Sequence, residues 1–469
     1  VIYLSKQVKS TSTMALIENI YYSVNFVNNY NEWIEKFRSK FAENQQNAYE
    51  EDSCIFDNVH VIPGIQRYPF GYSVEGKYRI YFSNKIGSNY PIYVIISAQE
   101  LHLNNVWVVL DKIDNTIKSI IKYYDNEINF DEVDFDYKLS RVDICNHNTF
   151  INIDKYFNLN KLFERTVTKL SDAHPWIEAV GETSQRTSYV RFGKGDMVVR
   201  FYNKIQEVCE QKYKDFFIPR WYDFGLIDEH TYHVYDFTYK LGNNYNVDFL
   251  FANIYFSNND EIINKAIQIY KNPNIQSREK YDFLHQIIRE NKIKIVKEVV
   301  NVEFQVRSNY LRSLKIEDDY GNIIDYTNIF EILCYIDKLY IYLTEKSFRI
   351  IKRNSKCKRK RDEKEMDHLW KKIHNSKIIN IGDINIDPET LKLYREYTKN
   401  NNKLFTTKRI VNSLTHLYYI NNSYSQEDLN EITMVEIFND FYNEYNLNEN
   451  YFHLKEKLYK QAKRYGWKS

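Results

Sequence analysis

One tyrosine of this chain stands between two cations, because Arg200, Tyr202 and Lys204 occupy every second position of a short run rich in β-branched and aromatic residues. Such a run predicts a strand over residues 197–204, and alternate residues of a strand point to the same face. Two fixed cations on that face could bind a phosphodiester and favour the phenolate, whose ordinary pKa is about 10. The pattern therefore indicates a tyrosine nucleophile. Since the chain has 42 tyrosines, an ordinary structural role is the competing interpretation.

Two further runs with strand character carry polar residues on one face. In the first run Arg141, Asp143 and His147 share a face, and the second run carries Glu303 and Gln305. An Asp and a His four residues apart on a bent strand, joined by a Glu from a neighbouring strand, could hold Mg²⁺ or Mn²⁺. The alternatives are a structural pair between Arg141 and Asp143, and a sheet with one solvated face.

The elements around these runs predict an α+β fold. Residues 188–204 have the pattern of a hairpin whose turn contains Gly193 and Gly195. Strand patterns at residues 71–97 precede a helical pattern at 106–124, and residues 159–170 also have helical spacing. We therefore expect a central antiparallel β-sheet that carries the active site, with helices packed on one side and a helical C-terminal region.

Composition and pattern divide the chain into three regions. Residues 1–310 form the predicted catalytic domain, with an irregular, partly helical insertion at about 206–296. Residues 311–375 form a basic region that is predicted to contact DNA. Residues 376–469 form a predicted helical C-terminal domain.

The basic region stands out because the whole chain has a formal charge of only +1. Residues 349–372 contain eleven Lys or Arg against four acids, a net charge of +7 that leaves −6 for the rest. Such a local charge is typical of phosphate contacts, although a solvated helix face or linker would have the same composition. The predicted DNA contacts are Lys352, Arg353, Lys358, Arg359, Lys360 and Arg361.

The remaining composition is that of an ordinary soluble protein. The five cysteines form no CxxC pair and no disulfide framework, which favours a reducing compartment. The sequence has no run of eighteen apolar residues and no pattern of a signal peptide. We therefore expect a cytoplasmic protein that does not enter the membrane.

The three polar motifs together resemble those of the Rep-trans class of rolling-circle plasmid replication initiators, which also resembles the relaxases of some integrative conjugative elements. In that class a motif like Arg-Leu-Asp is followed by a hairpin ending in Arg-(Ile/Leu)-Tyr-(Asn/Asp)-Lys and then by a strand like Val-Glu-Ile-Glu. The counterparts here begin at Arg141, Arg200 and Val302. The resemblance covers roughly residues 15–205 and 295–375.

The resemblance implies a DNA-nicking enzyme. Tyr202 would attack one strand at a plasmid origin, form a 5′-phosphotyrosine link and leave a 3′-hydroxyl that primes synthesis, while Arg200 and Lys204 hold the phosphate. It further implies a homodimer that recruits a host helicase. One alternative is a conjugative relaxase that nicks at a transfer origin. An alternative of another class is a non-catalytic protein that binds an origin.

The resemblance also implies a divalent metal, Mg²⁺ or Mn²⁺, held by Asp143 and Glu303, with His147 as a further candidate ligand. Two positions depart from the class pattern: His147 replaces a second Asp, and Gln305 replaces a second Glu. The insertion at 206–296 also stands where the class has a short connection. These departures leave open which residues complete the metal shell.

Overall fold

The computed structural model describes the chain with several gaps. The described residues are 11–26, 30–46, 54–74, 76–85, 88, 90–130, 135–153, 165–170, 176–179, 187–211, 213–317, 323–325, 328–352, 365–382 and 392–395. The chain divides into two compact units, Val1–Arg395 and Glu396–Ser469. The second unit, which contains most of the predicted helical C-terminal domain, lies outside the described residues.

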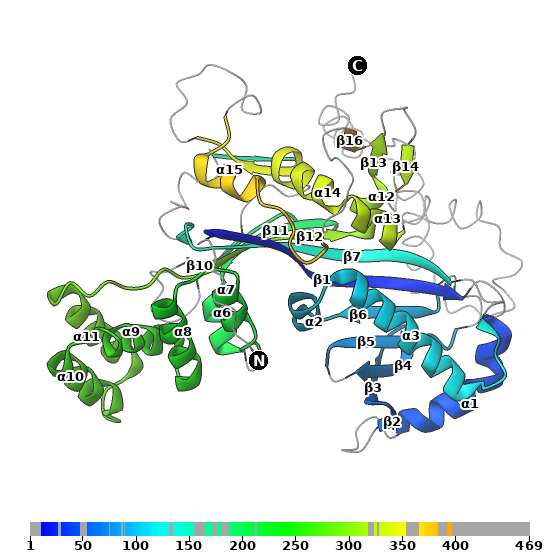
Figure 1. Ribbon diagram of the computed structural model, residues 1–469, viewed down its shortest axis with the longest axis horizontal. Helices are drawn as coiled ribbons and strands as arrows, with labels where there is room; N and C mark the ends of the chain where they lie inside the picture. The colour runs from blue at the N-terminus through cyan, green and yellow to red at the C-terminus, as the bar shows by residue number, and fades with distance from the viewer. Residues whose placement is uncertain are drawn as a thin grey trace, which may run out of the picture. The chain divides into compact units, whose positions relative to one another are not determined.

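An eleven-stranded antiparallel sheet is the centre of the first unit (Figure 1). Its strand order is β2-β3-β4-β5-β6-β1-β7-β12-β11-β10-β9. The predicted α+β class with a central antiparallel sheet is therefore confirmed. The strands are β1 (Thr13–Phe26), β2 (Cys54–Phe56), β3 (Val59–Ile65), β4 (Tyr68–Val74), β5 (Tyr78–Phe82), β6 (Ile92–Ile96), β7 (Phe135–Asn148), β9 (Trp176–Ala179), β10 (Thr187–Phe192), β11 (Met197–Asn203) and β12 (Val300–Arg307).

The helices fall into three groups along the chain. Those before the site strands are α1 (Tyr30–Gln46), α2 (Ala98–Leu103) and α3 (Val106–Tyr124). Those of the insertion are α6 (Lys204–Glu210), α7 (Phe217–Asp223), α8 (Glu229–Leu241), α9 (Tyr245–Tyr255), α10 (Asp260–Lys271) and α11 (Ser277–Glu290). Those after β12 are α12 (Ser308–Arg312), α13 (Ile329–Cys334), α14 (Ile336–Tyr342), the π-helical turn η3 (Leu343–Ser347) and α15 (His368–His374).

Both faces of the middle strands are buried, each by a different group of helices. Ile144, Val302 and Phe304 belong to the large core that includes α1, α3 and the helices after β12. Met14 and Leu16 of β1 belong to a second core with α6 to α9. Figure 1 accordingly shows α14 and α15 on one face of the sheet and α6 and α7 on the other. The insertion thus adds a second helical layer to the one that the sequence predicted.

Short polar caps explain how the insertion breaks into separate helices. The residue before each of four helices accepts a hydrogen bond from a backbone N–H of the first turn, which satisfies a donor that would otherwise have no partner in the helix. These N-cap residues are Asn203 (α6), Asp228 (α8), Asn244 (α9) and Asn259 (α10). Asn203 also ends β11, so Lys204 is the first residue of a helix and not the last residue of the predicted strand.

The helix predicted at residues 159–170 is wrong in its described part. Thr166–Thr168 forms the short strand β8, which pairs with β15 (Phe348–Ile350). Two threonines and a valine favour a strand, because their branched Cβ atoms restrict the side-chain torsion in a helix. The third sheet, which is also small, contains β13 (Leu314–Glu317), β14 (Ile323–Asp325) and β16 (Lys392–Arg395). Among the described helices, none is both long and apolar enough to cross a membrane.

Candidate active site

The three strands with predicted polar faces are neighbours in the sheet, in the order β7, β12, β11. Arg200 of β11 pairs with Glu303 of β12. Tyr202 pairs with Asn301, which in turn pairs with His147 of β7. Directly paired residues project to the same face of a sheet. Polar side chains from three distant stretches of sequence therefore share one face.

The Tyr202 hydroxyl has three polar neighbours. It donates a hydrogen bond to Glu303 Oε2 at 3.0 Å and accepts one from Asn301 Nδ2 at 2.8 Å. Lys204 Nζ lies 3.4 Å from the same oxygen. Burial, followed by the negative charges of Glu18 and Glu303, raises the pKa of Tyr202 well above its usual value. At neutral pH Tyr202 is therefore a neutral phenol that donates to Glu303.

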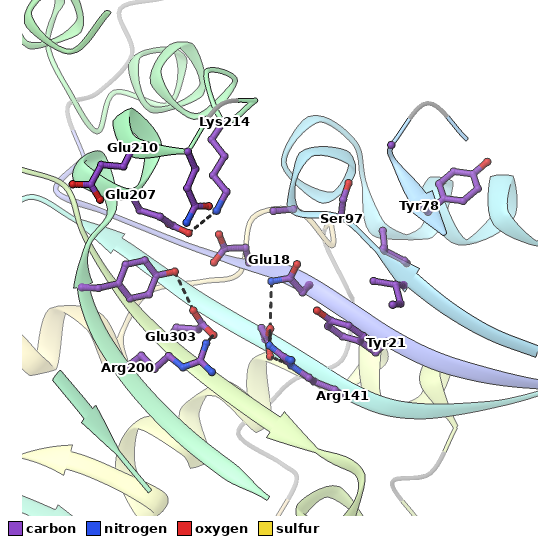
Figure 2. A pocket seen from close by; sticks show the side chains of 18 of the residues that line it. Glu18, Tyr21, Tyr78, Ser97, Arg141, Arg200, Glu207, Glu210, Lys214 and Glu303 are labelled. Carbon is purple, nitrogen blue, oxygen red and sulfur yellow. Dashed lines mark hydrogen bonds and ion pairs between the residues drawn. The ribbon is translucent and has the colours of Figure 1, made fainter. Parts of the chain in front are cut away.

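Glu303 is the carboxylate placed to receive that proton (Figure 2). Its Oε1 accepts a hydrogen bond from Arg200 Nη1 at 2.9 Å, while Oε2 accepts from Tyr202. Burial and the nearby carboxylates of Asp143 and Glu18 raise the pKa of Glu303 to about 7, in spite of Arg200. A carboxylate with a pKa near neutrality can both accept and release a proton at physiological pH.

Arg141 and Asp143 form a bidentate ion pair. Arg141 Nε donates to Asp143 Oδ1 at 2.8 Å, and Arg141 Nη2 donates to Oδ2 at 2.5 Å. Asn19 Nδ2 also donates to Oδ2 at 3.3 Å. The structure thus confirms the structural Arg–Asp pair that the sequence left open as an alternative.

Lys204 is an internal cation. Its side chain is 1% exposed, and its ammonium pairs with Glu18 and, at 2.7 Å, with Glu207 Oε2. It does not line the cavity in front of Tyr202, whereas Arg200 does. The two cations that flank Tyr202 in the sequence therefore occupy different surroundings, with only Arg200 facing the cavity.

Glu18 of β1 is a site residue that the sequence analysis missed. It is the extra residue of a β-bulge, because Ile17 pairs with Ile144 and Asn19 with Asp143, which leaves Glu18 without a paired residue on β7. It is 3% exposed. The available signal was its charge: Glu18 is the only charged residue in the β-prone run 14–29, and a lone buried carboxylate is costly unless it is paired.

A cavity of about 600 Å³ opens in front of Tyr202. Figure 2 shows charged side chains of several elements around it, among them Glu18, Arg200 and Lys214. Five carboxylates and four cations line it: Glu18, Asp143, Glu207, Glu210 and Glu303, with Arg79, Arg141, Arg200 and Lys214. The lining is therefore close to neutral, with an excess of one carboxylate when all are ionised.

Two groups of buried side chains in the described part of the chain could hold a metal ion. Glu18 forms one group with His102 and His147 and another with Cys145 and Glu303, and within each group the donor atoms lie within 4.8 Å of one another. The three predicted ligands are not gathered in one group. Glu303 and His147 belong to different groups, and Asp143 belongs to neither.

Existing contacts compete with a metal at each predicted ligand. Arg141 occupies both oxygens of Asp143, while Glu303 is held by Arg200 and Tyr202. A divalent ion at Asp143 or Glu303 would therefore have to displace these arginine contacts.

His147 belongs to one of the two possible metal groups, but its ring would have to change its tautomer to bind an ion. Burial lowers the pKa of His147 to about 3, so its ring is neutral. The Trp221 indole N–H donates to His147 Nδ1 at 3.1 Å, so the single ring proton must lie on Nε2. A protonated nitrogen has no free lone pair for a metal. His102 is a further residue that the sequence analysis missed. Its ring stacks on that of His147, with 5.6 Å between the ring centroids. Among the described residues neither ring nitrogen of His102 has a hydrogen-bond partner.

Of the six predicted DNA contacts, only Lys352 is among the described residues. Its ammonium pairs with Glu365 on the protein surface. Arg353, Lys358, Arg359, Lys360 and Arg361 lie outside the described residues. Their role therefore stays a prediction from the local charge.

Comparison with solved structures gave distant likenesses. No protein-family model matches the sequence, and no curated protein matches it. A solved structure of a rolling-circle replication initiator protein from Geobacillus stearothermophilus is similar over 76% of this chain and 94% of that chain, with 10% sequence identity and a TM-score of 0.34. A match at this level does not establish a shared fold, so the function must be argued from the site itself.

Proposed function

We propose that this protein nicks one strand of DNA through Tyr202 and thereby initiates rolling-circle replication. The observation that carries the proposal is the hydrogen bond from the Tyr202 hydroxyl to Glu303 at the wall of a cavity lined by arginines. A buried phenol with a raised pKa is a poor nucleophile unless a base removes its proton. Glu303, whose pKa is raised to about 7, is a base in direct contact with it.

In the proposed reaction the Tyr202 oxygen attacks the phosphorus of one phosphodiester while its proton passes to Glu303 Oε2. The bond between phosphorus and the 3′-oxygen breaks, and the 3′-oxygen takes up a proton from water. The hydroxide left behind takes the proton from Glu303, which returns to its ionised form. The DNA then carries a 5′-phosphotyrosine link and a free 3′-hydroxyl. While Glu303 holds the phenolic proton, the ionised carboxylates and the cations of the lining are equal in number.

Arg200 is the cation best placed to contact that phosphate. Its guanidinium holds Glu303 and, at 2.5 Å, Gln305 Oε1, while its buried Nε has no partner among the described residues. Lys204 acts from behind the tyrosine, because its ammonium is buried against Glu18 and Glu207. The predicted phosphate clamp thus reduces to Arg200.

A nicking assay on supercoiled DNA tests the proposal. The enzyme should convert supercoiled plasmid carrying its origin to open circles and remain covalently attached to the 5′ end. Open circles without a covalent adduct would contradict the tyrosine mechanism. Specific binding without any nicking would favour the non-catalytic origin-binding protein. Nicking confined to a transfer origin would favour the conjugative relaxase.

Mg²⁺ or Mn²⁺ is expected to bind the free protein only weakly, with a Kd above about 10⁻⁴ M, because arginines occupy the carboxylates that would hold it. Arg200→Gln should tighten Mn²⁺ binding by about tenfold or more, since it removes a cation beside Glu303. Electron paramagnetic resonance of free Mn²⁺ measures both values. Tight binding of one Mn²⁺ by the unaltered protein would show that the ion displaces the arginines readily.

The basic segment is expected to supply most of the non-specific DNA affinity. Neutralising Lys358, Arg359, Lys360 and Arg361 together should flatten the slope of log affinity against log salt by up to about three to four units, at roughly 0.9 per lost phosphate contact. Nicking of a short single-stranded substrate should change much less, because Arg200 lies at the active site. An unchanged slope would place the DNA on another surface.

A further inference from the structure

Glu18 is linked to the Tyr202 hydroxyl through two separate side chains. Its Oε1 pairs with the ammonium of Lys204, which lies 3.4 Å from the Tyr202 oxygen. Its Oε2 accepts from Asn301 Nδ2 at 3.2 Å, and the same Nδ2 lies 2.8 Å from the Tyr202 oxygen. A single carboxylate therefore holds both donors that face the tyrosine.

Burying the side chains of Glu18 and Lys204 costs free energy. Glu18 and Lys204 are both almost fully buried, and removing two charges from water is expensive unless they pair closely. The thiol of Cys145, on β7, donates a further hydrogen bond to Glu18 Oε2 at 2.6 Å. Burial raises the pKa of Glu18, but Lys204 and weaker neighbouring groups together lower it by more, so the pKa lies well below its usual range and Glu18 stays ionised.

The β-bulge explains how Glu18 of β1 reaches Lys204 and Asn301. Regular pairing would leave no extra residue between Ile17 and Asn19, and the bulge re-aims one side chain toward the site. Glu207 also pairs with Lys204 and lies on the same helix. The hydrogen bonds of the Asn301 amide in the described part of the chain go to Glu18, Cys145 and Tyr202, so it is Glu18 that joins the two donors.

We propose that Glu18 is a positioning residue for the nucleophile, holding Lys204 and Asn301 so that both point at the Tyr202 oxygen. This inference rests on the proposed function. When Tyr202 loses its proton to Glu303, the Lys204 ammonium and the Asn301 amide stabilise the developing negative charge on the phenolic oxygen. Preorganised donors of this kind act on the transition state, because they need no rearrangement as the charge forms.

A double-mutant cycle tests the inference, with Glu18→Gln, Lys204→Met and the two together. We expect Glu18→Gln to lower kcat for nicking by about tenfold to a hundredfold, with KM and DNA affinity unchanged. The loss of rate in the double variant should be smaller than the product of the two single losses, since Glu18 acts partly through Lys204 and partly through Asn301. Glu18→Asp keeps the charge and should recover part of the lost rate; it replaces Glu18→Gln if that variant does not fold.

Glu100→Gln is the matched control, because Glu100 is equally buried, lies on α2 and does not line the cavity. It should nick at the unaltered rate. Unaltered kcat in Glu18→Gln, or multiplied losses in the double variant, would overturn the inference. Full activity in Tyr202→Phe would instead overturn the proposed function, so the two failures are distinguishable.

Discussion

Replacing Tyr202 by phenylalanine is expected to lower DNA nicking by about a thousandfold or more and to abolish the covalent adduct. The substitution removes the attacking oxygen but keeps the ring that packs in the sheet. It also removes the hydrogen bonds to Glu303 and Asn301, which contribute to the site and not to the core. DNA affinity should survive, and gel analysis of 5′-labelled substrate measures nicking and adduct together.

Tyr189 is the matched control for this prediction. It pairs directly with Tyr202 across the β10–β11 hairpin and lines the same cavity. Tyr189→Phe should still form the covalent adduct. A peptide adduct mapped to Tyr189, or nicking by Tyr202→Phe at the unaltered rate, would show that the nucleophile has been misassigned.

Loss of the proposed base at Glu303 is expected to have the second large effect. Glu303→Gln is nearly isosteric but cannot take the phenolic proton, so nicking should fall by about 10²- to 10⁴-fold. The unaltered enzyme should show the titration of this group. Because only the ionised carboxylate accepts a proton and the pKa of Glu303 is about 7, the rate should rise with pH through about 7 and level off above it.

The predicted direction of the change in nicking rate with pH can be tested directly. Below the pKa of Glu303, the rate should fall about tenfold for each pH unit as the carboxylate becomes protonated. Glu303→Gln should lose this dependence as well as the rate. A profile that is flat across about two pH units around 7, or a slow variant that keeps the same midpoint, would assign the base to another group.

Several features of the site could be predicted from the sequence, because local patterns determine them. The alternation around Tyr202 predicted its strand, and Gly193 and Gly195 predicted the turn that makes β11 the return strand of a hairpin. Both glycines have a positive φ of 81°, a backbone conformation that residues with a side chain rarely adopt. The polar alternation of β7 and β12 likewise indicated which side chains share a face.

The tertiary structure decided which of these charges meet and what each one does. Strand register is set by pairing across long separations in sequence, so no local pattern showed that Tyr202 would lie beside Asn301. A bulge brought Glu18 to the site, and the start of α6 buried Lys204 behind the tyrosine. The sequence supplied the charged groups. Burial and pairing set the free energy of each charge, so only the packed sheet determined which group forms an ion pair, which holds a neighbour in place and which can exchange a proton.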